Sequence, residues 1–331
     1  LNHNVASIRK QFENFLDFSE SSESALLVNN DTWLGEYPLI AFLRDIGKHF
    51  RLGPMLSKDS VKTRLNSEEG ISFTEFTYQV LQGYDFYYLS KEYDVCLEMG
   101  GSDQWGNITA GIELTRKLAQ KQVFGLTYPL LTKSDGTKFG KSVGGAVWLS
   151  PNKTSPYQFY QYLIRVSDTE VIQLMRMLTF IDTEEIQEYE KKILSGDFVP
   201  NMLQKRLAEE VTRFVHGEEG LRKAIRVTEC AAPGSTATLD PEVLEEIALD
   251  MPNINLSIEE VLGKKYVEIA SIVGLCSSKS EATRLIKNGG AFLNNEKVVN
   301  ETLEIQITHI IAEKYLLFGS GKKTKILVKV Q

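Results

Sequence analysis

The chain has 331 residues, of which 42% are hydrophobic and 24% are charged, and its formal net charge is −7. This length predicts two or three domains, and the apolar fraction excludes a wholly disordered chain. No apolar run approaches the ~18 residues of a membrane-spanning helix, so we expect no membrane partner. Three scattered cysteines exclude a disulfide framework and indicate a reducing compartment. No zinc-ligand spacing occurs among the cysteines and histidines, so we expect no metal site; these residues are Cys96, Cys230, Cys276, His3, His49, His216 and His309.

Charge is distributed unevenly along the chain. Residues 264–331 carry eleven Lys and Arg against six Glu, although the chain as a whole is acidic. A basic terminal module on an acidic body is typical of a protein in which one module contacts a polyanion. A chance excess of surface lysine explains the same count equally well.

The first predicted segment, residues 1–152, mixes helix and strand patterns. Apolar residues recur with helical periodicity in 5–18, 38–50 and 73–90. An apolar run, 95–99, stops at Gly100-Gly101 and is followed by a helical pattern over 103–120. A strand, a glycine turn and a helix in this order form the unit of an open α/β sheet.

The second predicted segment, residues 153–257, is helical. Ser155-Pro156 supplies an N-cap and a proline at the first helical position. Helical patterns follow in 168–178, 183–194 and 202–216. The small, polar stretch 230–241 predicts a loop, and the charge-poor stretch 249–256 predicts a linker.

The third predicted segment, residues 258–331, is short and basic. It contains two helical patterns, near 266–273 and from Ser278 to Asn288, and the second stops at Gly289-Gly290. Residues 291–298 have the pattern of a hairpin with a polar turn.

The first group of candidate binding residues is a glycine-rich turn, Gly100 to Asn107. Glycines at such a turn let a ligand approach the backbone, and Asp103 is placed to accept from ribose hydroxyls. The alternative is structural, with Ser102 or Asp103 acting only as an N-cap.

Tyr78, Gln82 and Asp85 form the second group. Spacings of four and seven place them on one helical face. A phenol, an amide and a carboxylate on one face suit a small zwitterionic ligand with a polar end. A solvated polar face would have the same pattern.

The third group is the loop 132–142, which follows a short apolar stretch at 126–131. Three lysines, hydroxyls and two glycines form a cationic loop that can follow a moving phosphate charge. A surface hairpin with exposed lysines remains the alternative.

Together these groups resemble bacterial-type tyrosyl-tRNA synthetases, which are class I aminoacyl-tRNA synthetases. Five stretches carry the resemblance in the body of the chain, and a sixth resembles the S4 RNA-binding domain of the same family. The stretches are ISFTEFTYQVLQGYDF (71–86), GGSDQWGNITAG (100–111), FGLTYPLLTKSDGTKFGKS (124–142), KTSPYQFYQY (153–162), LAEEVTRFVHGEE (207–219) and SSKSEATRLIKNGGAFLNNEKV (277–298).

The resemblance implies an α/β fold in three domains: a Rossmann-like catalytic domain (1–152), an α-helical anticodon or tRNA-binding domain (153–257) and a small α+β S4-like domain (258–331). It also implies how tyrosine is bound. Tyr78 and Gln82 hold the amino group of the substrate, Asp85 accepts from its phenol, and Gln104 lies near its carboxylate. Glu98 departs from the family, in which we expect glutamine; it either perturbs tyrosine binding or belongs to a hydrogen-bonded core.

The same resemblance assigns the ATP and RNA contacts. The adenosine ribose is expected on Gly101 and Asp103. The class I signature loop, KFGKS, places Lys138, Lys141 and Ser142 at the phosphates, where the two lysines stabilise the departing pyrophosphate. RNA-binding residues are expected on the helix at 278–288, namely Lys279, Arg284 and Lys287.

One family motif is absent from the sequence. The H-x-G-H signature that grips ATP phosphates occurs at none of the four histidines, and the first residue is Leu rather than Met. The resemblance places residue 1 well inside the family's catalytic domain. We therefore expect the natural N-terminus to lie upstream, and we expect residues 1–331 alone not to form tyrosyl-adenylate at a useful rate.

The resemblance implies ATP-dependent activation of L-tyrosine and its transfer to tRNA(Tyr) in translation. ATP is then a substrate, accompanied by Mg²⁺, and the protein is expected to be a homodimer in bacterial cytoplasm or in an organelle. The rival interpretation is a non-catalytic RNA-binding protein derived from this fold. A nicotinamide dehydrogenase, which the glycine turn alone would allow, lacks G-x-G-x-x-G.

Overall fold

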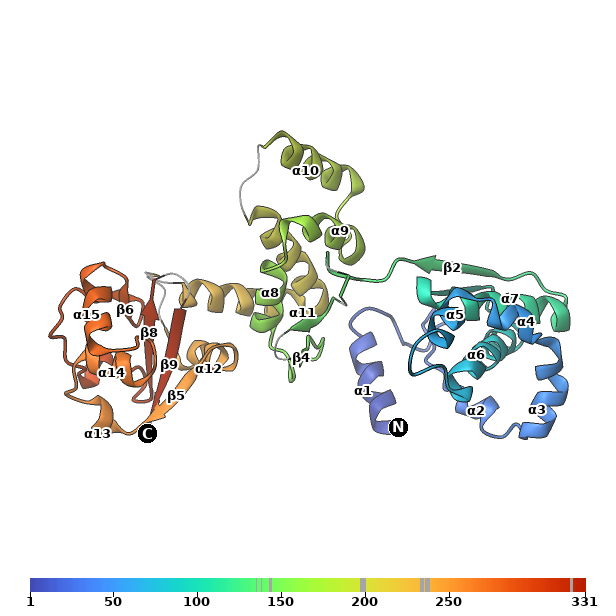
Figure 1. Cartoon of the computed structure of the whole chain (residues 1–331), viewed down its shortest axis with the longest axis horizontal. Coiled ribbons are helices and arrows are strands. Elements are labelled where there is room, and N and C mark those ends of the chain that lie inside the picture. Colours follow the sequence, from blue (N-terminus) through green and yellow to red (C-terminus); the bar gives the residue numbers. More distant parts are fainter. Residues whose placement is uncertain are drawn as a thin grey trace. The chain divides into compact units, whose positions relative to one another are not determined.

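The computed structural model describes residues 1–134, 136–137, 139–142, 145–196, 201–232, 235, 239–321 and 324–331. It divides into two compact units, Leu1–Phe139 and Gly140–Gln331. The first unit is mainly helical, with one pair of strands (Figure 1). Its elements are α1 (Asn2–Phe12), α2 (Asp31–Leu34), α3 (Leu39–Asp45), η1 (Gly47–His49), α4 (Leu52–Leu56), α5 (Asp59–Leu65), α6 (Phe73–Glu92), β1 (Leu97–Gly101), η2 (Ser102–Gln104), α7 (Trp105–Ala119) and β2 (Phe124–Tyr128).

Helix α6 is the central helix of the first unit. It begins after Ser72, whose hydroxyl accepts from the backbone N–H of Glu75 as an N-cap. An aromatic and aliphatic core lines one side of it, including Trp33, Phe42, Tyr84 and Leu114. Helices α6 and α7 pack closely because Gly111 leaves room: a Cβ there would lie 2.8 Å from the Cβ of Phe86. The helix predicted at 73–90 is confirmed.

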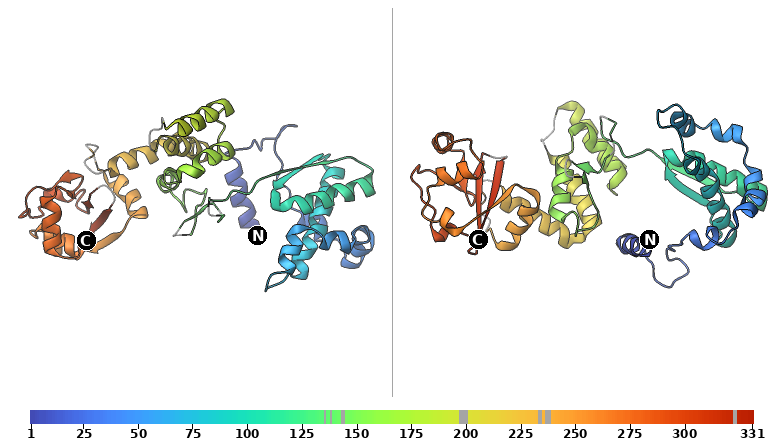
Figure 2. Two further views of the ribbon diagram at one scale, coloured as in Figure 1. Left: turned by 45° about the horizontal axis from the view of Figure 1, so that its top comes forward. Right: turned by 60° about the horizontal axis from the view of Figure 1, so that its bottom comes forward.

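Strands β1 and β2 pair in parallel, with Leu97 opposite Phe124, and α7 connects them. Figure 2 shows α7 lying along this pair. Because side chains alternate across a strand, Glu98 and Gly125 lie on the face that α7 covers, where a Cβ at Gly125 would meet Ile108 at 2.5 Å. The other face carries exposed apolar side chains, namely Leu97, Met99, Phe124, Leu126 and Tyr128. The strand–turn–helix unit predicted around the glycine turn is confirmed.

The second unit combines a helical region with a mixed sheet. Its elements are β3 (Lys141–Ser142), β4 (Gly145–Ala146), α8 (Pro156–Ile164), α9 (Asp168–Leu178), α10 (Thr183–Ser195), α11 (Met202–Ala231), α12 (Pro241–Asp250), β5 (Asn253–Leu256), α13 (Ile258–Val261), α14 (Tyr266–Ile272), α15 (Lys279–Lys287), β6 (Ala291–Leu293), β7 (Glu296–Lys297), η3 (Ile307–His309), β8 (Tyr315–Ser320) and β9 (Thr324–Val330).

Helices α8, α9, α10 and α11 begin at the residues where the sequence predicts them, whereas the sequence does not predict α12 and α13. Helix α8 starts with a capping box, in which Ser155 accepts from the N–H of Gln158 and the Gln158 side chain accepts from the N–H of Ser155. Helix α11 extends beyond the predicted end at residue 216. Its backbone is interrupted there at Gly217, where φ is +71°, a conformation that glycine adopts without a Cβ penalty.

The sheet of the second unit has the strand order β5-β9-β8-β6-β7. Alternating residues of β8 belong to two hydrophobic cores, one on each face of the sheet. Leu316 and Phe318 pack with α14 and α15. Tyr315 and Leu317 pack with α12 and with Val227 of α11. Both faces of the sheet are therefore covered, one by α14 and α15 and the other by α12 (Figure 1). The core on the α12 side also includes Tyr157 of α8 and Val227 of α11.

Three predicted elements need correction. The stretch 249–256 is not a linker, because α12 continues to Asp250 and Asn253–Leu256 forms β5, which pairs in parallel with β9. The helix predicted at 5–18 ends at Phe12, and the one predicted at 38–50 breaks into α3 and η1. The hairpin predicted at 291–298 is confirmed, with Asn294 and Asn295 at positive φ in its turn.

Candidate functional site

The glycine-rich turn joins β1 to α7 through η2. A Cβ at Gly101 would lie 2.6 Å from Oδ1 of Asp103, so a side chain there would displace the Asp103 carboxylate. Asp103 itself is exposed. Its Oδ2 accepts from Nε2 of Gln104 at 3.2 Å. The turn thus presents an open carboxylate at the end of a parallel strand, which is where α/β sheets bind ligands.

A chain of side-chain hydrogen bonds links this turn to α6. Nδ2 of Asn107 donates to Oε1 of Gln82 at 2.9 Å and to Oε1 of Gln104 at 3.4 Å. Nε2 of Gln82 in turn donates to Oε1 of Glu98 at 2.9 Å. The structure therefore brings Gln82, Gln104 and Asp103 together, as expected for one site, and Asn107 is the residue that joins them.

Glu98 belongs to this hydrogen-bonded cluster. Burial raises the pKa of its carboxyl, the hydrogen bond from Gln82 lowers it, and the charge of Asp85 raises it further. The second carboxylate oxygen, Oε2, is buried and has no hydrogen-bond partner among the described residues. Of the two alternatives for this departure from the family, the structure favours the hydrogen-bonded one.

The Asp85 carboxylate is held by hydrogen bonds from residues outside this cluster. Nε1 of Trp33 donates to Oδ1 at 2.7 Å, and Nδ2 of Asn30 donates to Oδ2 at 3.1 Å. Trp33 is itself fixed by stacking on Tyr88, with ring centroids 4.5 Å apart. Burial raises the pKa of Asp85, and the two hydrogen bonds partly oppose that shift. The carboxylate is oriented by neutral donors and has no cation beside it in any described ion pair.

Tyr78 lies about one turn of α6 before Gln82 and is not part of the hydrogen-bonded cluster. Its side chain is 57% exposed. The three residues predicted to share one helical face therefore have different environments. Tyr78 is exposed, whereas Gln82 and Asp85 are part-buried and hydrogen-bonded.

The predicted lysine loop is only partly described. Lys138 lies outside the described residues, and for Lys141 and Ser142 the structure describes the backbone alone. These two residues form β3, which pairs with β4 in a short antiparallel ladder. Gly136 and Gly140 have φ of +79° and +85°, so the loop turns at both glycines.

The three predicted RNA-binding residues lie on or at the end of α15. Lys279 pairs with Glu268 at 2.6 Å, and Lys287 pairs with Glu301 at 3.4 Å. Arg284 is exposed on the same helix. Both ion pairs are exposed and therefore contribute little to stability. Breaking them so that the lysines contact phosphates costs little free energy.

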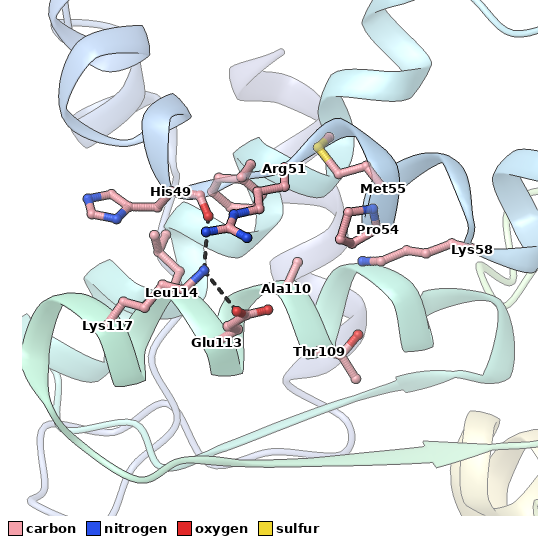
Figure 3. Close-up of a pocket in the computed structure, with 11 residues that line it drawn as sticks. His49, Arg51, Pro54, Met55, Lys58, Thr109, Ala110, Glu113, Leu114 and Lys117 are labelled. Carbon is pink, nitrogen blue, oxygen red and sulfur yellow. Dashed lines mark hydrogen bonds and ion pairs between the residues drawn. The ribbon is translucent and has the colours of Figure 1, made fainter.

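The first unit also contains a polar pocket of about 430 Å³ that sequence reasoning missed (Figure 3). Lys117 lies at its wall and donates to the backbone carbonyl of His49 at 3.0 Å and to Glu113 at 2.8 Å. Lys58 donates to the carbonyl of Gly106 in the first turn of α7, and burial lowers the pKa of its ammonium. Lys58 thereby ties the start of α7 to α4 and α5.

Two classes of feature are absent from the described part of the chain. It contains no cluster of three or more His, Cys, Asp or Glu side chains suited to a metal ion. None of its helices combines the length and apolarity that crossing a membrane requires.

Two family models match the chain. The model of class I tRNA synthetases (W and Y) matches residues 2–231, and the model of the tyrosine–tRNA ligase SYY-like C-terminal domain matches residues 243–328. The first covers more than half of the chain and includes every described residue of the hydrogen-bonded cluster.

Curated relatives agree with the family models. The tyrosine–tRNA ligase of Protochlamydia amoebophila (strain UWE25) is 55% identical over 327 residues, which cover 99% of this chain and 77% of the relative. The chloroplastic/mitochondrial tyrosine–tRNA ligase of Arabidopsis thaliana is 46% identical over 333 residues, which cover all of this chain and 65% of the relative.

Solved structures give the same result at the level of the fold. A C-terminally truncated mitochondrial tyrosyl-tRNA synthetase from Coccidioides posadasii aligns with a TM-score of 0.51 at 31% identity, over 66% of this chain and 64% of that one. The combination of a glycine turn after a parallel strand, the Gln82–Asn107–Gln104 cluster and these matches shows that the chain belongs to the tyrosine–tRNA ligases, a family of class I aminoacyl-tRNA synthetases.

Proposed function

We propose that the protein condenses L-tyrosine with ATP to tyrosyl-adenylate and passes the tyrosyl group to tRNA(Tyr), using the cluster between α6 and the glycine turn. The observation that carries this proposal is the hydrogen-bond chain from Gln82 through Asn107 to Gln104 and Asp103. This hydrogen-bond chain joins Gln82 and Gln104, which are assigned to the amino acid, to Asp103, which is assigned to ATP.

The proposed tyrosine contacts follow the chemistry of each side chain. Asp85 accepts from the phenol, because each of its oxygens has a free lone pair beyond the bond from Trp33 or Asn30. Gln82 accepts from the ammonium together with Tyr78. Gln104, whose Nε2 carries a second N–H, donates to the tyrosine carboxylate.

The proposed ATP contacts lie on the glycine turn and in the lysine loop. Gly101 and Asp103 bind the ribose, and Lys138, Lys141 and Ser142 contact the phosphates. No side chain acts as a nucleophile, because the tyrosine carboxylate attacks the α-phosphate. Catalysis then consists of positioning and of charge stabilisation as pyrophosphate departs. Mg²⁺ is proposed to arrive with ATP and to be held chiefly by its phosphates, the usual mode for this ion.

The remaining assignments concern the second unit and the assembly. Lys279, Arg284 and Lys287 are proposed to contact tRNA phosphates from an S4-like domain, in a homodimer that works in bacterial cytoplasm or in an organelle. The division into 1–152, 153–257 and 258–331 remains a prediction, although β5, from the middle range, pairs with β9.

Tyrosine-dependent exchange of pyrophosphate into ATP tests the proposed activity in the natural full-length protein. Exchange that requires tyrosine and is not supported by phenylalanine is the expected result. RNA binding without any exchange would instead identify a non-catalytic RNA-binding protein. A Gln82→Met variant, which retains length but removes the amide, tests the assigned site: it should raise the tyrosine concentration needed for exchange, and an unchanged requirement would contradict the assignment.

A further inference from the structure

The lysine loop and the short ladder that follows it are attached to helix α8 at two points. Upstream, the backbone N–H of Gly140 donates to the phenol oxygen of Tyr162, near the end of α8, at 2.9 Å. Downstream, the backbone N–H of Trp148 donates to Oγ1 of Thr154, just before α8, at 3.0 Å. Lys141 lies between these two points, so its backbone is held on both sides.

Gly140 is the residue at which the loop depends most on such a bond. Its φ is +85°, and a Cβ there would meet nothing within 4 Å, so the backbone conformation rather than the available space favours glycine. Glycine also gives the backbone its widest conformational freedom. The carbonyl of Gly140 accepts from the N–H of Val147 at 2.8 Å, next to the pairing of β3, which contains Lys141, with β4. The bond to Tyr162 therefore fixes the residue with which this ladder begins.

Helix α8 provides a rigid support for the bond. Tyr162 is half-buried, and its helix neighbours Phe159 and Leu163 are no more than 5% exposed. Nε2 of Gln161 donates to Oγ1 of Thr228 at 2.8 Å, which ties α8 to α11. A side chain on a helix that is packed and tied in this way can hold a loop precisely.

We propose that Tyr162 is a positioning residue for the adenylation step, because its phenol oxygen accepts from the Gly140 N–H and so holds the backbone of Lys141 in place. The inference rests on the role proposed above for Lys141 at the ATP phosphates. A backbone that is already ordered loses less conformational entropy when its lysine meets the developing charge of pyrophosphate. Tyr162 thus acts through Lys141 and needs no contact with ATP itself.

The Tyr162→Phe variant tests this role, since it removes the hydroxyl and keeps the ring. In the full-length protein it should lower the single-turnover rate of adenylation about 3- to 10-fold, the factor that one neutral hydrogen bond represents. The dissociation constant for tyrosine should not change. The Gly140 amide should exchange its hydrogen faster, because its local protection is lost. Tyr189→Phe, which removes a hydroxyl that donates to Glu185 within α10, is the matched control and should alter none of these quantities.

A double-mutant cycle separates positioning from a general defect in α8. If Tyr162 acts through Lys141, Tyr162→Phe should not slow adenylation further in a Lys141→Ala background, because residues that act as a unit have non-additive effects. A defect in the packing of α8 would instead lower the rate by the same factor in both backgrounds.

Three results would overturn the inference: an unchanged or faster adenylation rate in Tyr162→Phe, an equal loss with and without Lys141, or unaltered hydrogen exchange at Gly140. Lys141→Ala alone separates this failure from that of the proposed function. If Lys141→Ala slows adenylation and Tyr162→Phe does not, only the role of Tyr162 is wrong. If Lys141→Ala adenylates at the normal rate, the assignment of Lys141 is wrong and the role of Tyr162 is refuted with it.

Discussion

Trp33 donates its indole N–H to Oδ1 of Asp85 at 2.7 Å, across 52 residues of sequence. This bond fixes the carboxylate that is proposed to read the tyrosine phenol. Because the donor is neutral, it orients Asp85 without neutralising its charge, and a phenol can still donate to the same group.

Replacement of Asp85 should alter the choice between tyrosine and phenylalanine. In Asp85→Ala, tyrosine should lose about 1–3 kcal/mol of binding free energy because its phenol loses a charged acceptor. Phenylalanine should lose much less, since it makes no such bond. Calorimetric titration of both amino acids into the full-length protein measures the difference, and equal losses for the two would show that Asp85 does not bind the phenol.

The bond from Trp33 should be visible in the pH dependence of tyrosine binding. Burial raises the pKa of Asp85, and the Trp33 bond lowers it. Trp33→Phe removes the lowering contribution, so the carboxyl will protonate at a higher pH. Tyrosine affinity, which requires the ionised acceptor, should then begin to fall at a higher pH on acidification than in the unaltered protein.

The same change has a consequence for stability with a defined sign. A carboxyl whose pKa is raised in the folded state contributes stability below its unfolded pKa, and that contribution is lost as the pH rises through the folded pKa. Because Trp33→Phe raises the folded-state pKa of Asp85 further, the variant should continue to lose this stability up to a higher pH than the unaltered protein does. Denaturant titrations across the acidic range check it, with Trp148→Phe, an exposed tryptophan of the second unit, as control. Identical pH profiles for the two variants would contradict the role of the indole.

Lys138 and Lys141 should affect the chemical step rather than tyrosine binding. If they stabilise charge as pyrophosphate leaves, alanine at either position should lower the adenylation rate by roughly 10²–10³. Tyrosine affinity should stay the same, because these residues are assigned to phosphates. Single-turnover kinetics separates rate from affinity, and Lys153→Ala, a lysine that covers the ring of Trp148, is the control. A variant that adenylates normally but binds tyrosine weakly would refute the assignment.

Point substitutions test the RNA-binding residues better than deletion of 264–331. A deletion would remove β8 and β9 and leave β5 and α12 without their packing partners. Glutamine at Lys279, Arg284 or Lys287 should weaken tRNA binding and reduce the slope of log affinity against log salt by about 1 per lost phosphate contact. Adenylation should be unaffected. An unchanged slope in the triple variant would show that α15 does not contact RNA.

The sequence was sufficient for the parts of the site that are local in the chain. Periodicity places Gln82 and Asp85 on α6, and a strand followed by two glycines places Asp103 at the end of β1. The partners of these residues come from far along the chain: Trp33 and Asn30 for Asp85, and Asn107 for Gln82. Periodicity carries no information on such contacts, since they depend on how α2 and α7 pack against α6.

The second unit shows the same limit. The hairpin at 291–298 could be predicted because its turn chemistry lies within eight residues. Strand β5 could not be predicted, because its partner β9 lies more than seventy residues later in the chain. In addition, a strand this short has too few residues for its hydrophobic periodicity to be detected. Without that pairing, 249–256 resembles a linker.

A crystal structure of the full-length protein with a non-hydrolysable tyrosyl-adenylate analogue tests the central claim most directly. We predict the phenol oxygen within hydrogen-bond distance of Asp85, the ammonium on Oε1 of Gln82 and the ribose hydroxyls on Asp103. An analogue bound elsewhere, for example in the pocket beside Lys58 and Lys117, or bound without contact to Asp85 and Gln82, would contradict the account.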